Sequence, residues 1–298
     1  MDDAIIIGGS FAGLTAAMHL VRARRRVTLV DTGQPRNRYA AAAHNVLGFD
    51  GVPPLDIRRA GLANVLAYPT ARHVAAEAVG IGGVRDDFVV RLAGGESLVG
   101  RRIILAYGVA DQLPAIPGFA ECWGKTVIHC PYCHGYEVAG GRLGLLYSSP
   151  ASLHATVLLR DWTDTLTLFT NGLDLPDGVE ARIKARGNGV LEGRVAAFLH
   201  EAGRLRAVRM ESGREVGLDA MLAHPRVLPS ARLHEDLGAE TLEAPLGPYL
   251  KVDDEGQTTV PGVFAAGDLA GPRHSINGAM HGGMIAGVGC HRSLLDWS

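Results

Sequence analysis

The chain has 298 residues, 47% of which are apolar, and a formal net charge of −2, so its length suits two compact domains with a large core. No apolar run approaches the roughly 18 to 20 residues that cross a bilayer, and the start Met1-Asp2-Asp3 lacks the basic residues of a signal peptide, so we expect a soluble protein of the cytoplasm. The near-neutral charge argues against nucleic acid or an anionic membrane as the main partner.

The first 31 residues have the pattern of a dinucleotide-binding unit. The apolar run Ile5–Ile7 predicts a buried parallel strand, the turn Gly8-Gly9-Ser10-Phe11-Ala12-Gly13 follows it, and residues 14–21 have helical apolar spacing. A second strand is expected at 27–30, ending at Asp31. In such a unit the helix N-terminus holds a pyrophosphate and the acid holds a ribose. Ser10 departs from the pattern, because the middle position is usually glycine.

Residues 32–54 are rich in Gly, Pro, Asn and Arg, which indicates a long loop that wraps a ligand. Its polar candidates for contact with the cofactor are Arg36, Asn37, His44 and Asn45. Further strands are expected at 88–92 and 103–105, and Ala106-Tyr107-Gly108 follows the second of them. The proline-bearing stretch 113–118 then predicts a hinge into another domain.

The stretch 129–137, His-Cys-Pro-Tyr-Cys-His-Gly-Tyr-Glu, places two thiols at C-x-x-C spacing beside imidazoles. Such a pair indicates either redox chemistry or half of a zinc site. A zinc site needs a second pair of ligands, whereas Cys122 and Cys290 are isolated in the sequence. Redox chemistry is therefore favoured, no metal is expected, and the two isolated cysteines are interpreted as buried small hydrophobes.

A second strand–turn–helix frame follows the cysteine pair. Strands are expected at 143–147 and 166–169, with an apolar helix at 151–159 between them. Tyr147-Ser148-Ser149 stands where a pyrophosphate turn has glycines, and Thr170-Asn171-Gly172 stands where an acid or arginines would select NAD or NADP. Neither cofactor is specified by this frame. Strands are also expected at 204–210 and 215–222.

The chain ends with a buried strand that runs into Ala265-Ala266-Gly267-Asp268 and a helix expected over about 275–295. The strand therefore ends in a tight turn and a carboxylate. The start of the helix would present unpaired N–H groups, which stabilise negative charge.

Four motifs in order resemble the low-molecular-weight thioredoxin reductase group of flavoproteins: residues 8–13, Ala106-Tyr107-Gly108, Cys130-Pro131-Tyr132-Cys133 and Ala265-Ala266-Gly267-Asp268. Within that group, residues 130–137 are most similar to the dithiol oxidases that close the disulfides of gliotoxin and holomycin. The resemblance implies an α/β fold of two Rossmann-like, three-layer ββα nucleotide-binding domains, the second inserted in the first. It also implies an FAD-binding domain of residues 1–112 plus 245–298, a cysteine-bearing domain of residues 113–244, and a homodimer.

The resemblance also assigns roles to residues. It implies that Cys133 faces the flavin, that Cys130 exchanges with substrate, and that His134, standing where thioredoxin reductases usually have an aspartate, moves the proton. Asp31 would hold the adenosine ribose and Asp268 the ribityl chain. The remaining FAD-binding positions are Gly8, Ser10, Phe11, Ala12, Gly13, Arg36, Asn37, His44, Gly108, Gly267, Ser275 and Ile276. His129, His274 and His281 are further candidates for proton carriers near the flavin.

Three functions compete. The first is an FAD-dependent dithiol oxidase that takes electrons from a small-molecule dithiol and passes them to dioxygen. The second is a disulfide reductase that acts on thioredoxin-like proteins and uses NADPH weakly or another electron donor. The third is a redox-responsive binding protein with structural FAD. The degenerate second nucleotide frame favours the oxidase, and the intact cysteine pair argues against the third function.

Overall fold

A computed structural model describes residues 1–295 and divides the chain into two compact units. The first unit is Met1–Arg38, Pro53–Ala110 and Val227–Ser298, and the second is Tyr39–Val52 and Asp111–Arg226. Two segments therefore differ from the predicted domains. Residues 227–244 belong to the first unit, where the backbone N–H of Ile81 donates to Asp236 at 3.1 Å. Residues 39–52, part of the predicted ligand loop, belong to the second unit.

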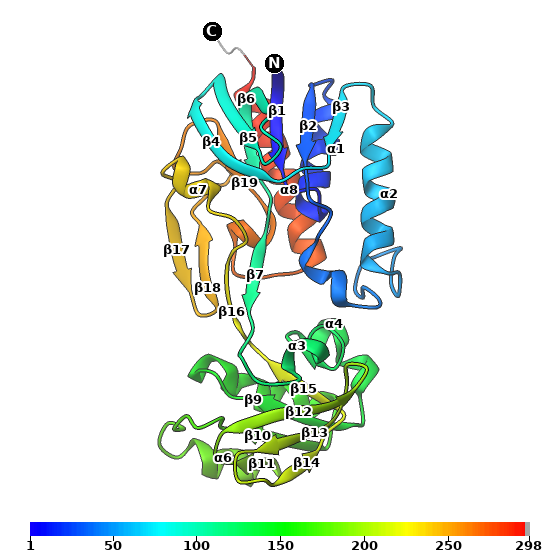
Figure 1. The fold of residues 1–298 in the computed structure, drawn as a ribbon, viewed down its shortest axis with the longest axis vertical. Coiled ribbons are helices and arrows are strands. Elements are labelled where there is room, and N and C mark those ends of the chain that lie inside the picture. The colour runs from blue at the N-terminus through cyan, green and yellow to red at the C-terminus, as the bar shows by residue number, and fades with distance from the viewer. Residues whose placement is uncertain (296–298) are drawn as a thin grey trace. The chain divides into compact units, whose positions relative to one another are not determined.

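The first unit is built on a mixed sheet (Figure 1). Its parallel strands are β3 (Ala71–Val74), β2 (Val27–Val30), β1 (Asp2–Ile7), β6 (Ser97–Leu105) and β19 (Val263–Ala265). The antiparallel β5 (Asp87–Leu92) and β4 (Ala78–Val84) extend it beyond the N-terminal half of β6. Within the long strand β6, residues 97–100 pair with β5 and residues 103–105 pair with β19, so each half of β6 has a different neighbouring strand.

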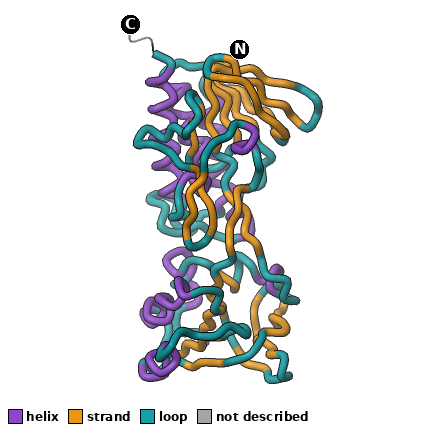
Figure 2. Tube along the Cα trace, turned by 90° about the vertical axis from the view of Figure 1, so that its left-hand side faces the viewer, coloured by secondary structure: helices purple, strands orange, loops and turns teal. Residues whose placement is uncertain are grey.

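Alternation along β1 divides the core of this unit into two layers. Ala4 and Ile6 pack on the side of α1 (Phe11–Arg22), α2 (Pro54–Leu66) and α8 (Ile276–Ser293). Ile5 and Ile7 pack on the opposite face with residues of β4 and β5. Figure 2 shows the helices of this unit lying along its strands. All of these side chains of β1 are almost fully buried, as the apolar run predicts.

The second unit contains its own parallel sheet. Its order is β11 (Gly189–Leu191), β10 (Thr165–Phe169), β9 (Arg142–Leu146), β15 (Ala220–Ala223) and β8 (Val127–Ile128). An antiparallel sheet of β12 (Val195–Glu201), β13 (Arg204–Met210) and β14 (Glu215–Gly217) packs on one face. The short helices α5 (Ala155–Leu158) and α6 (Val179–Ala185) contribute to the core of the other face. The sheet thus lies between two layers, as in a Rossmann-like domain, and the predicted α/β class is confirmed.

Short elements complete both units. They are β7 (Val109–Gln112), α3 (Phe119–Cys122), α4 (Pro131–His134), β16 (Arg226–Pro229), α7 (Leu233–Asp236), β17 (Thr241–Ala244) and β18 (Gly247–Leu250). The strands β7 and β16 carry the chain across the boundary between the units and pair with each other. Among residues 1–295, no helix has both the length and the apolar character needed to cross a membrane.

The structure differs from the predicted elements in three places. The helix expected at 151–159 is instead a 3-10 turn, Pro150–His154, followed by the four-residue α5 and another 3-10 turn. The strand expected at 215–222 is divided between β14 and β15, which belong to different sheets. Residues 54–66, not assigned from the sequence, form α2.

Candidate functional site

The turn between β1 and α1 is tight because glycines allow two close approaches. Gly8 has φ 109°, and a Cβ there would collide with the Ala106 carbonyl. A Cβ on Gly13 would collide with the Gly8 carbonyl oxygen. Ser10 is the N-cap of the 12-residue α1 and makes no side-chain capping hydrogen bond among the described residues. The first N–H groups of α1, from Phe11 and Ala12 onward, are therefore available to an anion.

The carboxylate of Asp31 is held beside this turn. Its Oδ1 accepts from the Gly9 backbone N–H at 2.9 Å, and its Oδ2 accepts from the Gly33 N–H at 3.0 Å. Arg58 of α2 donates from Nε to the Gly9 carbonyl at 2.8 Å and forms an ion pair with Asp31. Arg58 was missed from the sequence, and the signal for it was the unassigned α2, whose Pro at the first helical position marks its start.

A second cluster in the same unit joins the far ends of the sequence. Arg36 donates to Asp268 Oδ2 at 3.1 Å and lies 2.8 Å from His274 Nδ1. His274 directly precedes Ser275, the N-cap of α8, whose hydroxyl accepts from the Gly278 N–H at 2.9 Å. Ile276 begins the helix. The structure thus brings together four predicted cofactor residues, namely Arg36, Asp268, Ser275 and Ile276, at the start of α8.

The other predicted cofactor residues of this unit surround these two clusters. Asn37 lies in the 3-10 turn Arg36–Tyr39, Gly108 has φ 71° after β6, and Gly267 has φ 75° after β19. Tyr107, which precedes Gly108, places its hydroxyl 2.9 Å from His234 Nδ1. The carboxyl ends of β1, β6 and β19 therefore carry the candidate residues, which is where parallel sheets bind nucleotides.

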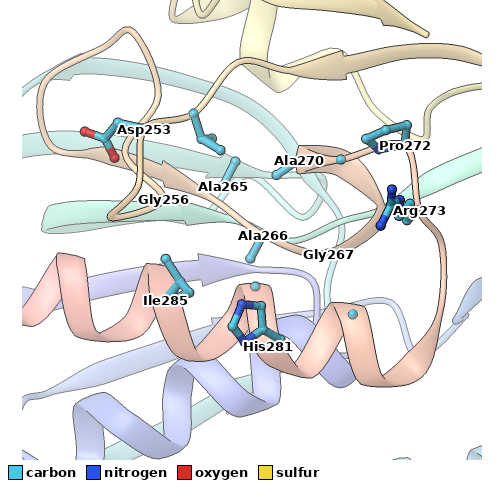
Figure 3. A pocket seen from close by; sticks show the side chains of 14 residues that line it. Asp253, Gly256, Ala265, Ala266, Gly267, Ala270, Pro272, Arg273, His281 and Ile285 are labelled. Atoms are coloured by element: carbon cyan, nitrogen blue, oxygen red, sulfur yellow. The ribbon is translucent and has the colours of Figure 1, made fainter.

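A cavity of about 270 Å³ lies between β19 and α8 in the first unit. Figure 3 shows His281 and Ile285 of α8 facing Ala265 and Ala266, with Arg273 at one end. His281, a candidate proton carrier in the sequence, lines this cavity. Gly267, next to Asp268, also lines it, so the cavity borders the second cluster.

The second unit carries the C-x-x-C cysteine pair. Cys130 and Cys133 form a disulfide with Cα atoms 5.3 Å apart, and the four-residue α4 begins at Pro131 between them. Proline suits the first helical position because its missing N–H would be unpaired there in any case. Cys122 and Cys290 are buried free thiols, as predicted. Burial raises the pKa of both, to about 12 for Cys290, so neither is an available thiolate near neutral pH.

His134 follows the disulfide directly and has an unusual environment. Both of its ring nitrogens are buried without a hydrogen-bond partner among the described residues. Burial lowers the pKa of His134, the carboxylate of Glu137 raises it, and His44 lowers it further. The imidazole is therefore held neutral near pH 7, which leaves it able to accept a proton.

His44 lies in the second unit with the redox centre. Its Nε2 is 3.2 Å from Glu137 Oε1, and its Nδ1 is 3.5 Å from Asp50 Oδ2. The adjacent Asn45 donates from Nδ2 to the Tyr132 carbonyl at 2.6 Å, within the C-x-x-C segment. His44 therefore belongs to the second unit, whereas Arg36 and Asp31 belong to the first, and its contact with a cofactor stays a prediction.

The second nucleotide frame differs from the first in its turn residues and in the helix that follows them. Tyr147 is buried after β9, and its backbone N–H donates to the Phe169 carbonyl at 2.9 Å. A 3-10 turn begins at Pro150 where the first unit has the long helix α1. His154 of that turn stacks on His224, which follows β15, with ring centroids 6.2 Å apart.

Comparison with known proteins identifies the family. The profile described as pyridine nucleotide-disulphide oxidoreductase matches residues 2–283. The chain belongs to the pyridine nucleotide-disulphide oxidoreductase family. Within that family, the chain is 32% identical to the thioredoxin reductase tcpT of Claviceps purpurea over 98% of this chain and 94% of the relative.

Solved structures agree with this assignment. An oxidoreductase of Agrobacterium tumefaciens is 39% identical and superimposes with a TM-score of 0.93 over 98% of both chains. The structure of HlmI is also 39% identical, with a TM-score of 0.91 over 98% of this chain and 92% of that one. The thioredoxin reductase-like resemblance drawn from four sequence motifs is confirmed.

The first unit fits the FAD that members of this oxidoreductase family bind. The turn at Gly8 and Gly13 has no room for a Cβ, and within residues 1–295 the Ser10 N-cap makes no side-chain hydrogen bond to the start of α1. The carboxylates of Asp31 and Asp268 stand at the carboxyl ends of β2 and β19. These are the donors and acceptors that a pyrophosphate and two polyol segments require.

Proposed function

We propose that this protein is an FAD-dependent dithiol oxidase that closes disulfides in a small-molecule dithiol and passes the electrons to dioxygen. The observation that carries this proposal is the contrast between the two nucleotide frames of one chain. In the first, a glycine turn opens onto the 12-residue α1. In the second, a buried tyrosine and a proline-started 3-10 turn occupy the equivalent positions.

The contrast bears on the source of electrons. A pyrophosphate binds where backbone N–H groups at a helix start are unobstructed. The second frame has only short, interrupted helical turns, and the side chains of Tyr147, Ser148 and Ser149 stand in place of glycines. With weak binding of NADPH, electrons reach the disulfide from a thiol substrate more readily than from a pyridine nucleotide.

The roles of the redox residues follow from their chemistry. In the proposal, Cys130 exchanges with substrate, Cys133 is the leaving thiolate, and His134 accepts the proton of the incoming thiol. FAD, when bound to the first unit, would accept the electron pair and deliver it to dioxygen. Gly8, Ser10 and Gly13 would hold its pyrophosphate, Asp31 its adenosine ribose, and Asp268 its ribityl chain. The homodimer and the cytoplasmic location also stay predictions.

A disulfide reductase is the second candidate, because curated relatives such as tcpT carry the name thioredoxin reductase.

The two functions differ in what reduces the purified protein. We expect bound FAD that is bleached within seconds by anaerobic dithiothreitol, and oxygen uptake when air is readmitted. We expect NADPH at physiological concentration to leave the flavin oxidised. Rapid bleaching by NADPH together with micromolar affinity would favour the reductase instead. FAD that no dithiol reduces would indicate the redox-responsive binding protein.

A further inference from the structure

The segment 39–52 forms a closed loop that presents one imidazole. An antiparallel bridge between Ala43 and Val52 closes its base, with the Ala43 N–H donating to the Val52 carbonyl at 2.9 Å. Asn45 adopts φ 63°, and its backbone N–H donates to Asp50 Oδ1 at 2.8 Å. The same carboxylate reaches His44 at 3.5 Å. The loop therefore holds the His44 ring by its own backbone geometry and by Asp50.

The loop is attached to the redox segment at two points. Asn45 donates to the carbonyl of Tyr132, which lies between the two cysteines. His44 contacts Glu137, four residues after Cys133, at 3.2 Å. Glu137 and His44 both shift the pKa of His134, in opposite directions. The region beside the disulfide therefore includes the imidazoles of His134 and His44 and the carboxylates of Glu137 and Asp50, and His129 directly precedes Cys130 in the chain.

Oxidation of a dithiol by this disulfide releases two protons. One substrate thiolate attacks Cys130 Sγ, the bond between Cys130 and Cys133 breaks, and Cys133 leaves as a thiolate. The second substrate thiolate attacks its partner sulfur in the mixed disulfide, and Cys130 leaves as a thiolate. The substrate loses two electrons and two protons, and the cysteine pair gains the two electrons. The imidazole of His134 can accept one of the two protons, so a second acceptor is needed.

We propose that His44 is the second proton acceptor of this exchange. This inference rests on the proposed dithiol chemistry. Protonation of both imidazoles places two positive charges beside the two carboxylates, so the segment stays close to neutral. His44 has a side chain that is 23% exposed, so it can release its proton to water, whereas both ring nitrogens of His134 are buried.

The test measures reduction of the Cys130–Cys133 disulfide in the full-length holoprotein by dithiothreitol without oxygen. The rate of the first turnover is followed by the amounts of alkylated cysteine and reduced flavin, over pH 5.5 to 9. His44→Asn should slow it on the order of 10²-fold at pH 7, with recovery toward pH 9 as the dithiol ionises unaided. His200→Asn, an exposed histidine of the same unit, should leave the rate profile unchanged.

Recovery of the rate toward pH 9 is a signature that a merely structural contact does not produce. His44→Gln and far-UV circular dichroism check that the loop substitution leaves the protein folded. Wild-type rates over this pH range in both folded His44 variants would overturn the role of His44 and leave the dithiol oxidase standing. A wild-type disulfide that dithiothreitol does not reduce would overturn the proposed function and this inference together.

Discussion

Arg58 is the residue that holds the nucleotide turn to its acid. It contacts both the Gly9 carbonyl and the Asp31 carboxylate, and the two charged side chains are only 13% and 11% exposed. At this depth each charge depends on the other for the hydrogen bonds that it lost from water. Removal of the guanidinium therefore leaves a largely buried carboxylate with the two backbone donors alone.

Arg58→Met should weaken the first unit and its retention of FAD. Breaking a fully buried pair costs about 3–5 kcal/mol, and we expect roughly 2 kcal/mol here because the pair is partly exposed. The measurement is the midpoint of urea unfolding together with the dissociation constant of FAD. Arg59→Met is the matched control, since Arg59 is 76% exposed and pairs with Asp56 on the same helix. Equal losses in the two variants would contradict the role of Arg58.

His134→Asn should slow reduction of the disulfide by a dithiol by about 10²- to 10⁴-fold at pH 7. Asparagine keeps the approximate size of the ring and removes its titration. The deficit should shrink above the thiol pKa of about 8.5, where the substrate ionises without help. Stopped-flow flavin reduction between pH 6 and 9 measures it. A variant that matches wild type over this range would remove His134 from the proton transfer and point to His129.

The helix α8 packs on α1 through glycines. A Cβ on Gly283 would collide with the Ala12 carbonyl oxygen, and one on Gly287 would lie 2.9 Å from the Ala16 carbonyl oxygen. The two helices are consequently closer than ordinary side chains allow. This close packing places the start of α8 beside Arg36 and Asp268, and so it supports the second cluster of the candidate site.

Gly283→Ala should destabilise the protein by about 1–3 kcal/mol, which is typical of overpacking. Helix propensity alone predicts the opposite sign, a gain of up to about 1 kcal/mol. Gly61→Ala in α2 is the control, because its Cβ would meet only the flexible end of Leu14, at 3.3 Å. Urea unfolding of both variants decides between packing and propensity. A Gly283→Ala protein as stable as wild type would show that the helices separate at little cost.

At the scale of elements, sequence reasoning succeeded where local pattern and tertiary role coincide. The strand at 27–30 matches β2, and the strand at 204–210 matches β13, because their apolar patterns agree with their burial. The prediction of a helix at 151–159 was wrong, because its apolar residues lie in short helical turns that pack on the sheet. The stretch 215–222 reads as one strand, yet Leu218 and Asp219 turn the chain from one sheet to another.

The candidate site was predictable in its motifs and not in its contacts. Gly8, Gly13 and Asp31 follow from spacing along the chain, and the C-x-x-C disulfide follows from proximity in sequence. Arg58 and the pairing of His44 with Glu137 depend on how a helix and a loop fold back over many residues. No periodicity or spacing encodes such contacts, so only the structure supplies them.

Across the whole molecule, several histidines have lowered pKa values in the folded state, so folding opposes their protonation. Burial lowers the pKa of His134, His224, His234 and His291, and for each of them it is the largest cause. The unfolded chain has ordinary imidazoles with pKa values near 6.5, so it binds protons first as the pH falls. Stability is therefore full above about pH 6.5 and decreases below it.

The urea midpoint should accordingly be lower at pH 5.5 than at pH 7.5. Carboxylates with lowered pKa values, such as Asp219 with a pKa of about 2, act in the same direction but only below about pH 4. His224→Asn should reduce the difference between the two pH values, since it removes one of the buried imidazoles. His200→Asn should preserve it. Midpoints that agree at the two pH values would contradict this account of the buried histidines.

Strand β6 pairs with β5 along one half and with β19 along the other, which affects the order in which parts of this protein can fold during synthesis. The second unit is complete once residue 226 has been made, whereas the parallel neighbour of β6, strand β19, and the helix α8 come only afterwards. Until then Ile103, Ile104 and Leu105 lack one side of their core. Because domains fold as units during synthesis, we expect the cysteine-bearing unit to fold first. The nucleotide turn of the first unit can bind a flavin only after the final segment has been made and has folded.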